Sequence, residues 1–217
     1  PDAAIKNYRQ AITLSPEYAE AHNNLGTVLK SKGDFALAVS SYKTAIRLKP
    51  DYAEAHNNLG NALRNLGHPR DALASYDQAL RLKPNFVDAH SNKGNALRDL
   101  NQPEPAMQCY SAALALNPNY VQAHNNMGNA LRDLKRHEDA IESYRASVDI
   151  APDFIDALRN LAATLQSTGD TKQAIAMIAN AAGAFLVKAI STDARVMKTF
   201  GVDLNLRIFN VIQSSLI

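Results

Sequence analysis

The sequence lacks the features on which several classes of protein depend. Its 217 residues include a single cysteine, Cys109, so no disulfide can form within the chain. One cysteine fits the cytoplasm or another reducing intracellular compartment, which is where we expect the protein. Tryptophan is absent, aromatic residues make up 6% of the chain, and the formal net charge is only +2. A charge this small argues against a nucleic-acid binder.

Long hydrophobic runs and a secretory leader are also missing. The longest mostly apolar stretch, residues 174–187, is interrupted by Asn180 and Gly183. A bilayer span takes about 20 apolar residues, which this stretch does not reach. The first residues, Pro1-Asp2-Ala3, lead directly into a helical pattern. We therefore expect a soluble chain with no membrane span.

What the sequence does contain is a repeat with a period of 34 residues. Five prolines share this spacing: Pro16, Pro50, Pro84, Pro118 and Pro152. Five tyrosines share it as well: Tyr8, Tyr42, Tyr76, Tyr110 and Tyr144. Four glycines follow the same step: Gly26, Gly60, Gly94 and Gly128. Several residue types with one common period indicate an array of similar structural units.

The repeats resemble the tetratricopeptide repeat when places are counted from Ala19, Ala53, Val87, Val121 and Ile155. The second repeat supplies the residues typical of that family: His56, Leu59, Gly60, Ala72, Tyr76, Ala79 and Pro84. The resemblance covers residues 1 to about 182. It implies an all-α, right-handed superhelical solenoid of antiparallel helical hairpins, whose inner wall comes mainly from the first helix of each hairpin.

Helix packing and backbone chemistry explain the residue types at several of these places. Gly60 and Ala72 are expected where two helices cross closely, and Tyr76 is expected to fill the space toward the next hairpin. Pro84 has no backbone N–H and would stop the second helix. Pro69 and Pro103 fall near the first turn of a second helix, where proline is tolerated.

The boundaries of the array follow from the register. The first helices are expected at about 19–32, 53–66, 87–100, 121–134 and 155–168. Residues 1–16 match only a second helix, so we expect a fragment of a longer array that begins within a repeat. The repeat pattern fades after residue 182. Residues 183–217 are expected to form a C-terminal helical cap or the start of a further region.

The expected inner wall carries a regular set of asparagines. Place six is asparagine in every repeat, and we call this set the asparagine ladder: Asn24, Asn58, Asn92, Asn126 and Asn160. Place nine adds three more: Asn61, Asn95 and Asn129. Place twelve is basic in four repeats: Lys30, Arg64, Arg98 and Arg132. Place two is mostly acidic, so the ladder is expected to lie between a basic stripe and an acidic stripe.

Asparagine has a modest helix propensity because its side chain competes for backbone hydrogen bonds. Its repeated use on one wall therefore suggests that these side chains have a function other than stabilising the helix. An amide can bond to the N–H and the C=O of an extended peptide without reading its side chains. Alternatively, the asparagines bond to one another between repeats or to water. The arginines could likewise meet acidic groups of a ligand or pair with acidic residues of neighbouring repeats.

The segment Ala55-His56-Asn57-Asn58-Leu59-Gly60-Asn61 is similar to repeats of the O-GlcNAc transferase family. That resemblance implies that the asparagine ladder grips the backbone of a substrate polypeptide. A carboxylate clamp for chaperone C-termini is disfavoured, because places two and five lack the lysines that it needs.

No catalytic, metal or cofactor site is expected. His22, His56, His90 and His124 recur once per repeat, but neighbouring helices lie about 8–10 Å apart and zinc ligands lie about 2 Å from one ion. Cys109 is expected to be a packing residue. Lys93 replaces the leucine of place seven, so either its stem packs and its amine reaches solvent, or the stack is looser there.

We therefore expect a non-enzymatic scaffold that binds an extended peptide or a partner protein through the ladder, the place-nine asparagines and the three arginines of place twelve. The alternative is the substrate-recruiting arm of an O-GlcNAc-type glycosyltransferase. Self-association through open repeat ends is a further expectation.

Overall fold

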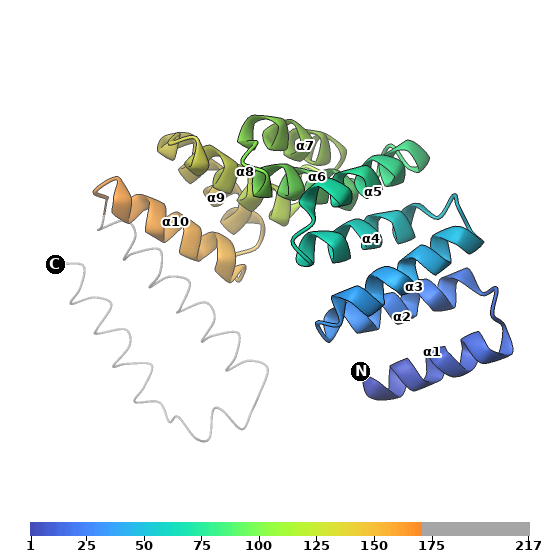
Figure 1. The fold of residues 1–217 in the computed structure, drawn as a ribbon. Coiled ribbons are helices and arrows are strands. Elements are labelled where there is room, and N and C mark those ends of the chain that lie inside the picture. The colour runs from blue at the N-terminus through green and yellow to red at the C-terminus, as the bar shows by residue number, and fades with distance from the viewer. Residues whose placement is uncertain (171–217) are drawn as a thin grey trace, which may run out of the picture. The chain divides into compact units, whose positions relative to one another are not determined.

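The computed structural model describes residues 1–170, and the described part of the chain contains α-helices and no strand (Figure 1). The helices are α1 (Asp2–Leu14), α2 (Ala19–Ser31), α3 (Phe35–Leu48), α4 (Ala53–Asn65), α5 (Pro69–Leu82), α6 (Val87–Asp99), α7 (Pro103–Leu116), α8 (Val121–Asp133), α9 (His137–Ile150) and α10 (Ile155–Ser167). The chain divides into two compact units, the first spanning Pro1–Pro118 and the second beginning at Asn119. Among the described residues, no helix is long and apolar enough to cross a membrane.

Helices pair as antiparallel hairpins within each unit. In the first unit, α2 packs on α3, α4 on α5 and α6 on α7, while α1 packs on α2. In the second unit, α8 packs on α9 and α10 on α9. The first helices of successive hairpins also touch, α2 with α4 and α4 with α6. These pairs confirm the predicted all-α array of hairpins.

The expected helix positions agree closely with the observed ones. Each of the five first helices begins at the expected residue and ends one residue earlier than expected. Pro69 and Pro103 stand at the first positions of α5 and α7, where a missing N–H costs no helical hydrogen bond. The predicted C-terminal cap and the boundary at residue 182 lie outside the described residues, and the right-handed superhelix stays a prediction.

A left-handed turn follows every first helix and sends the chain back into the second helix. Five residues, again 34 apart, take a positive φ there: Gly33, Gly67, Asn101, Lys135 and Gly169. In the first of these turns the N–H of Gly33 bonds to the C=O of Lys30, and the N–H of Asp34 bonds to the C=O of Leu29. This is the Schellman pattern, which satisfies carbonyls that a helix end leaves open.

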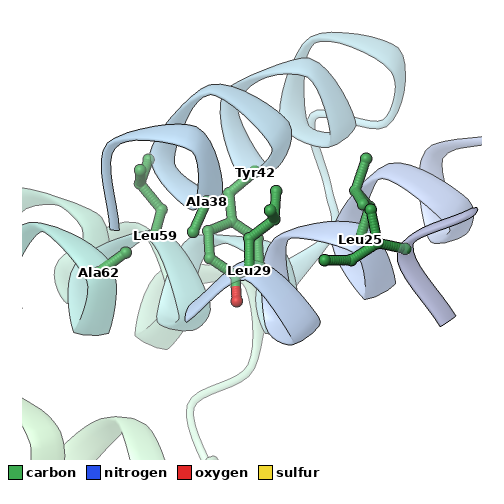
Figure 2. Packing of buried hydrophobic residues seen from close by; sticks show 7 residues of the cluster. Leu25, Leu29, Ala38, Tyr42, Leu59 and Ala62 are labelled. Atoms are coloured by element: carbon green, nitrogen blue, oxygen red, sulfur yellow. The ribbon is translucent and has the colours of Figure 1, made fainter. Parts of the chain in front are cut away.

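The core is built around the tyrosine of each second helix. Tyr42 is fully buried and lies among Leu29 and Ala38 of its own hairpin and Leu59 and Ala62 of the next (Figure 2). Tyr76, Tyr110 and Tyr144 are equally buried. The prediction that this tyrosine fills the space toward the next hairpin is confirmed for the first unit.

Glycine at place eight makes room for the tyrosine ring. A Cβ atom added to Gly60 would lie 2.5 Å from Cε1 of Tyr76, and one added to Gly26 would lie 2.7 Å from Cε1 of Tyr42. The same clash occurs at Gly94 and Gly128. Gly60 is therefore small because an aromatic ring of the same hairpin lies directly on its Cα.

Lys93 on α6 makes an ion pair with the preceding hairpin. Its side chain is half-buried, and its Nζ lies 2.7 Å from Oδ1 of Asp77 on α5. The first of the two predicted arrangements, with a packed stem and an amine reaching outward, agrees with this ion pair.

The contact between Gly60 and Tyr76 leads to a stability prediction. At an unobstructed helix site, Gly→Ala stabilises by about 1 kcal/mol. Here the added methyl overlaps the ring, so Gly60→Ala is expected to lower the free energy of unfolding by about 1–3 kcal/mol, as overpacking does. Urea denaturation followed by circular dichroism measures the change. In a Tyr76→Leu background, where the ring is gone, the same substitution should cost nothing, and an equal cost there would contradict the assigned clash.

Candidate functional site

In each unit the predicted asparagines lie on one face of the first helices, which we call the amide face. It consists of the side chains at places five, six and nine, on α2, α4 and α6 in the first unit and on α8 and α10 in the second. In the first unit, Asn58, Asn61, Asn92 and Asn95 are half-buried, so part of each amide meets solvent. Places six and nine are three residues apart and therefore neighbours on a helix surface.

Amides of successive repeats bond to each other across this face. In the first unit, Asn58 donates through Nδ2 to Oδ1 of Asn23 at 3.0 Å, and Asn92 donates to Oδ1 of Asn57 at 3.0 Å. In the second unit, Asn160 donates to Oδ1 of Asn125 at 2.9 Å. The donors are members of the asparagine ladder. The acceptors stand at place five of the preceding first helix and are buried.

These bonds are one of the two alternatives left open by the sequence, since asparagines do pair between repeats. Each bond, however, uses only the nitrogen of the place-six amide. The oxygens of Asn58 and Asn92 make no hydrogen bond to another described residue. Asn58 and Asn92 thus fasten neighbouring repeats and still present their oxygens as acceptors.

The place-nine asparagines bond to the core tyrosines. Tyr76 donates its hydroxyl proton to Oδ1 of Asn61, and Tyr110 donates to Oδ1 of Asn95, both at 2.8 Å. In the second unit Tyr144 bonds to Asn129 at the same distance. In the first hairpin, where place nine is threonine, Tyr42 instead donates to Thr27 Oγ1 at 3.3 Å. Sequence reasoning missed this role of the tyrosine, although tyrosine and asparagine share the 34-residue period.

Burial keeps these hydroxyls protonated. Desolvation raises the pKa of Tyr110 to about 12 and raises the pKa of Tyr76 further still, because a buried phenolate would lose its hydration. Nearby arginines, Arg98 for Tyr110 and Arg64 for Tyr76, oppose the shift without cancelling it. The hydroxyls therefore donate hydrogen bonds over the whole physiological pH range.

The basic stripe is largely engaged within the protein. Nε of Arg64 lies 2.6 Å from Oδ2 of Asp99 on the next first helix. Arg98 lies close enough to the Tyr110 hydroxyl for its charge to oppose the rise of that pKa. In the second unit, Nη2 of Arg132 lies 3.4 Å from Oδ1 of Asn129. Pairing with an acidic residue of a neighbouring repeat, one of the two predicted arrangements, is confirmed for Arg64.

The acidic stripe is neutralised in the same way. Glu20 pairs with Lys49 at 3.0 Å, and Glu54 pairs with Lys83 at 2.9 Å, each within one repeat. The hydrogen bond from Lys83 lowers the pKa of Glu54. The ammonium of Lys83 also lies 4.7 Å from the centre of the Phe86 ring. Neither stripe thus presents a run of unpaired charge in these repeats.

Three of the recurring histidines contact a backbone carbonyl six residues earlier in the chain. Nε2 of His22 and of His56 lies 3.0 Å from the carbonyl oxygen of Pro16 and Pro50 respectively, and His90 repeats the contact with Pro84 at 2.8 Å. Each histidine therefore ties its first helix to the proline that ends the previous repeat. The described residues contain no group of three or more side chains suited to hold a metal ion.

Cys109 on α7 is half-buried. Burial raises the pKa of its thiol, and Lys93 opposes the rise only in part. A raised pKa disfavours the thiolate that nucleophilic chemistry needs.

The bond between Asn92 and Asn57 leads to a prediction about stability. A double-mutant cycle with Asn57→Ala and Asn92→Ala is expected to give a coupling of about 0.5–1.5 kcal/mol, typical of a neutral hydrogen bond. Urea denaturation of the two single variants and the double variant measures it. Coupling indistinguishable from zero would show that the two amides do not bond in solution.

Comparisons with known proteins bear on this arrangement. A model described as TPR repeat matches residues 2–33, 27–67 and 94–132, and one described as tetratricopeptide repeat matches residues 53–86 and 121–154. No curated protein matches the sequence.

Solved structures of similar fold include several repeat proteins. MamA is 27% identical over 76% of this chain and 96% of its own, with a TM-score of 0.64. MamA from Desulfovibrio magneticus RS-1, from residue 41 to its end, is 25% identical over 76% and 93%, with a TM-score of 0.65. YrrB, described as a TPR protein with an unusual peptide-binding site, is 25% identical over 80% and 90%, with a TM-score of 0.59. With its repeat register, its hairpins and these matches, the chain belongs to the tetratricopeptide repeat family.

Proposed function

We propose that this chain is a protein-interaction scaffold that binds an extended polypeptide along the amide face, chiefly through the asparagine ladder. The observation that carries the proposal is the pair of amide oxygens of Asn58 and Asn92, which remain available after these amides have bonded to the preceding first helix. YrrB, which has a similar fold, is described as having a peptide-binding site, and this supports the same kind of ligand here.

The amide face suits the main chain of a ligand better than its side chains. Every residue of a ligand except proline carries one N–H and one C=O, so a row of amides can bond to any extended sequence. Amide side chains carry no charge and therefore do not discriminate between acidic and basic ligands. A face of this kind selects for an extended conformation.

The charged stripes support the same conclusion. Arg64 is paired with Asp99, and Glu54 is paired with Lys83. A ligand carboxylate would have to displace an existing ion pair to reach Arg64. The loss of that pair would offset most of the free energy gained from the new one. Arg64, Arg98 and Arg132 are therefore expected to contribute less to ligand binding than the asparagine ladder does.

The bonds between asparagines do not exclude a ligand. Asn58 gives its nitrogen to Asn23 and keeps its oxygen for solvent or a peptide N–H. The inter-repeat bond restricts the amide to one orientation. A ligand therefore meets an acceptor whose position is set beforehand, which lowers the entropic cost of binding.

Alanine substitution of the ladder tests the proposal. The triple variant Asn58→Ala, Asn92→Ala, Asn126→Ala is expected to bind at least tenfold more weakly than the unmodified chain, because three acceptors are lost. The probe is a fluorescein-labelled dodecapeptide selected against the unmodified chain from a random phage library, and fluorescence anisotropy measures the affinity.

A matched control distinguishes the effect of losing amides from the amide face from the effect of losing an asparagine elsewhere. Asn7→Ala removes an exposed asparagine from α1, outside the amide face, and should leave the affinity unchanged. Circular dichroism should show that the triple variant keeps its helicity, with stability lower by about 1–3 kcal/mol for each buried acceptor left unpaired at Asn23 and Asn57. Equal affinity of the triple variant and the unmodified chain would refute binding at this face.

The salt dependence of binding provides an independent check. Because the stripes are internally paired, affinity for the same peptide is expected to change by no more than about threefold between roughly 50 and 500 mM sodium chloride. Anisotropy titrations at the two salt concentrations measure this. A much steeper fall would show that ion pairs with the ligand dominate instead.

A second candidate function uses the same face. The ladder would equally serve the substrate-recruiting arm of an O-GlcNAc-type glycosyltransferase, since such an arm must also hold extended polypeptide. A glycosyltransferase domain encoded after residue 217 in the parent gene would distinguish this candidate from a free-standing adaptor. Self-association through open repeat ends stays a prediction, which the mass from light scattering across a dilution series can test.

A further inference from the structure

The hydrogen bonds of the amide face fix the direction in which each amide points. An asparagine side chain can present either its oxygen or its nitrogen to a ligand, and in water it does both. On α4 and α6, the amides at places six and nine are held by different internal partners. The consequence is a defined pattern of donors and acceptors, which goes beyond the presence of a ladder.

The geometry points to a positioning role for the core tyrosines: Tyr76 and Tyr110 hold the amides of Asn61 and Asn95 with the nitrogen outward. The hairpins of α4 with α5 and of α6 with α7 then each offer one acceptor at place six and one donor at place nine to the backbone of a single extended residue. This inference rests on the proposed function, since it assumes that a polypeptide is the ligand.

The orientation at place nine follows from the tyrosine hydroxyl that each amide meets. The hydroxyl of Tyr110 lies 2.8 Å from Oδ1 of Asn95, and an amide oxygen can only accept. Tyr76 makes the same bond to Asn61. Each amide turns its oxygen toward its tyrosine, which leaves the two Nδ2 protons for a ligand.

In the second unit an arginine contacts the place-nine amide together with the tyrosine. Tyr144 lies 2.8 Å from Oδ1 of Asn129, and Nη2 of Arg132 lies 3.4 Å from the same oxygen. Because the guanidinium can only donate, the atom that it contacts must be the amide oxygen. Asn129 is thus oriented as Asn61 and Asn95 are.

The orientation at place six is the opposite one. Asn58 and Asn92 give their nitrogens to Asn23 and Asn57 of the preceding first helix. Their oxygens are left as the ligand-facing atoms. The pairs Asn58 with Asn61 and Asn92 with Asn95 therefore each combine one outward acceptor with one outward donor, and we call each pair a rung.

The first unit also contains an incomplete rung, which is useful as an internal control. On α2, place nine is Thr27, and the oxygen of Asn24 already accepts a bond from Asn23 at 3.3 Å. Tyr42 donates to the threonine hydroxyl and orients no amide. Loss of the Tyr42 hydroxyl should therefore not affect the binding of a peptide.

A rung matches the chemistry of an extended polypeptide. In an extended chain, the N–H and C=O of one residue point to the same side, as they do in an antiparallel sheet. One residue can therefore donate to place six and accept from place nine together. First helices that pack about 8–10 Å apart would meet a chain rising about 3.3 Å per residue once in roughly three residues.

The test removes two hydroxyls while keeping the rings that fill the core. The variant Tyr76→Phe, Tyr110→Phe is expected to bind the selected dodecapeptide at least fivefold more weakly, because both place-nine amides become free to turn. Tyr42→Phe is the matched control and should bind within about twofold of the unmodified chain, although it loses a hydroxyl from the same place in its hairpin. Affinity of the double variant equal to that of the control would overturn the inference.

A second pair of substitutions distinguishes donation to the ligand by Asn61 and Asn95 from a purely structural role of these residues. Asn61→Asp and Asn95→Asp keep an oxygen for the tyrosine hydroxyl but replace the outward donor with an acceptor. They should abolish binding of the peptide, whereas Asn61→Ser and Asn95→Ser, which restore a small donor, should recover part of it. Equal binding by the aspartate and serine variants would contradict the assigned donor.

An NMR measurement without ligand distinguishes failure of this inference from failure of the proposed function. If the amides are locked, the hydroxyl protons of Tyr76 and Tyr110 exchange slowly enough with water to be observed. Slow hydroxyl exchange with no peptide bound by any variant would leave the orientation standing and would refute the proposed function. Rapid exchange of both hydroxyl protons would overturn the orientation itself.

Discussion

A tyrosine ring lying directly on a glycine of the facing helix is the contact on which the rest of this structure depends. At Gly60 the ring of Tyr76 occupies the space that a Cβ atom would need, so the two helices of the hairpin approach closely. The same ring packs beside Ala96 of the next first helix, so it also joins successive hairpins. Its hydroxyl then reaches through to Asn61 on the amide face. One side chain thus connects the core with the surface that we propose binds polypeptide.

The amide face and the charged stripes use their hydrogen-bonding capacity in different ways. Arginines and acidic residues are satisfied inside the protein, as in the pair of Arg64 with Asp99. Asn58 and Asn92 are satisfied only in part, because an amide has both donors and an acceptor and each of these two gives only its nitrogen to a neighbour. What remains for a ligand is a set of uncharged hydrogen-bond donors and acceptors with fixed directions. Such a pattern explains why a repeat protein would keep asparagine on helices despite its modest propensity.

Much of the fold could be predicted from the sequence because the repeat period places every helix start. The left-handed turns were harder to recognise, since glycine, asparagine and lysine all occupy the equivalent position, as at Gly67, Asn101 and Lys135. The asparagine ladder could be listed from its period, but its amide directions could not. They depend on which partner each side chain meets in three dimensions. Asn57 at place five has no visible role in the sequence, because its use as a buried acceptor depends on the packing of α4 against α6.

The central claim is that each complete rung binds the backbone of one extended residue with a fixed polarity. A crystal structure of the chain with a bound peptide tests it most directly. The account predicts peptide carbonyl oxygens about 3 Å from Nδ2 of Asn61 and Asn95, and peptide nitrogens at a similar distance from Oδ1 of Asn58 and Asn92. A peptide bound on another face, or one whose N–H groups point to place nine and whose carbonyls point to place six, would contradict it.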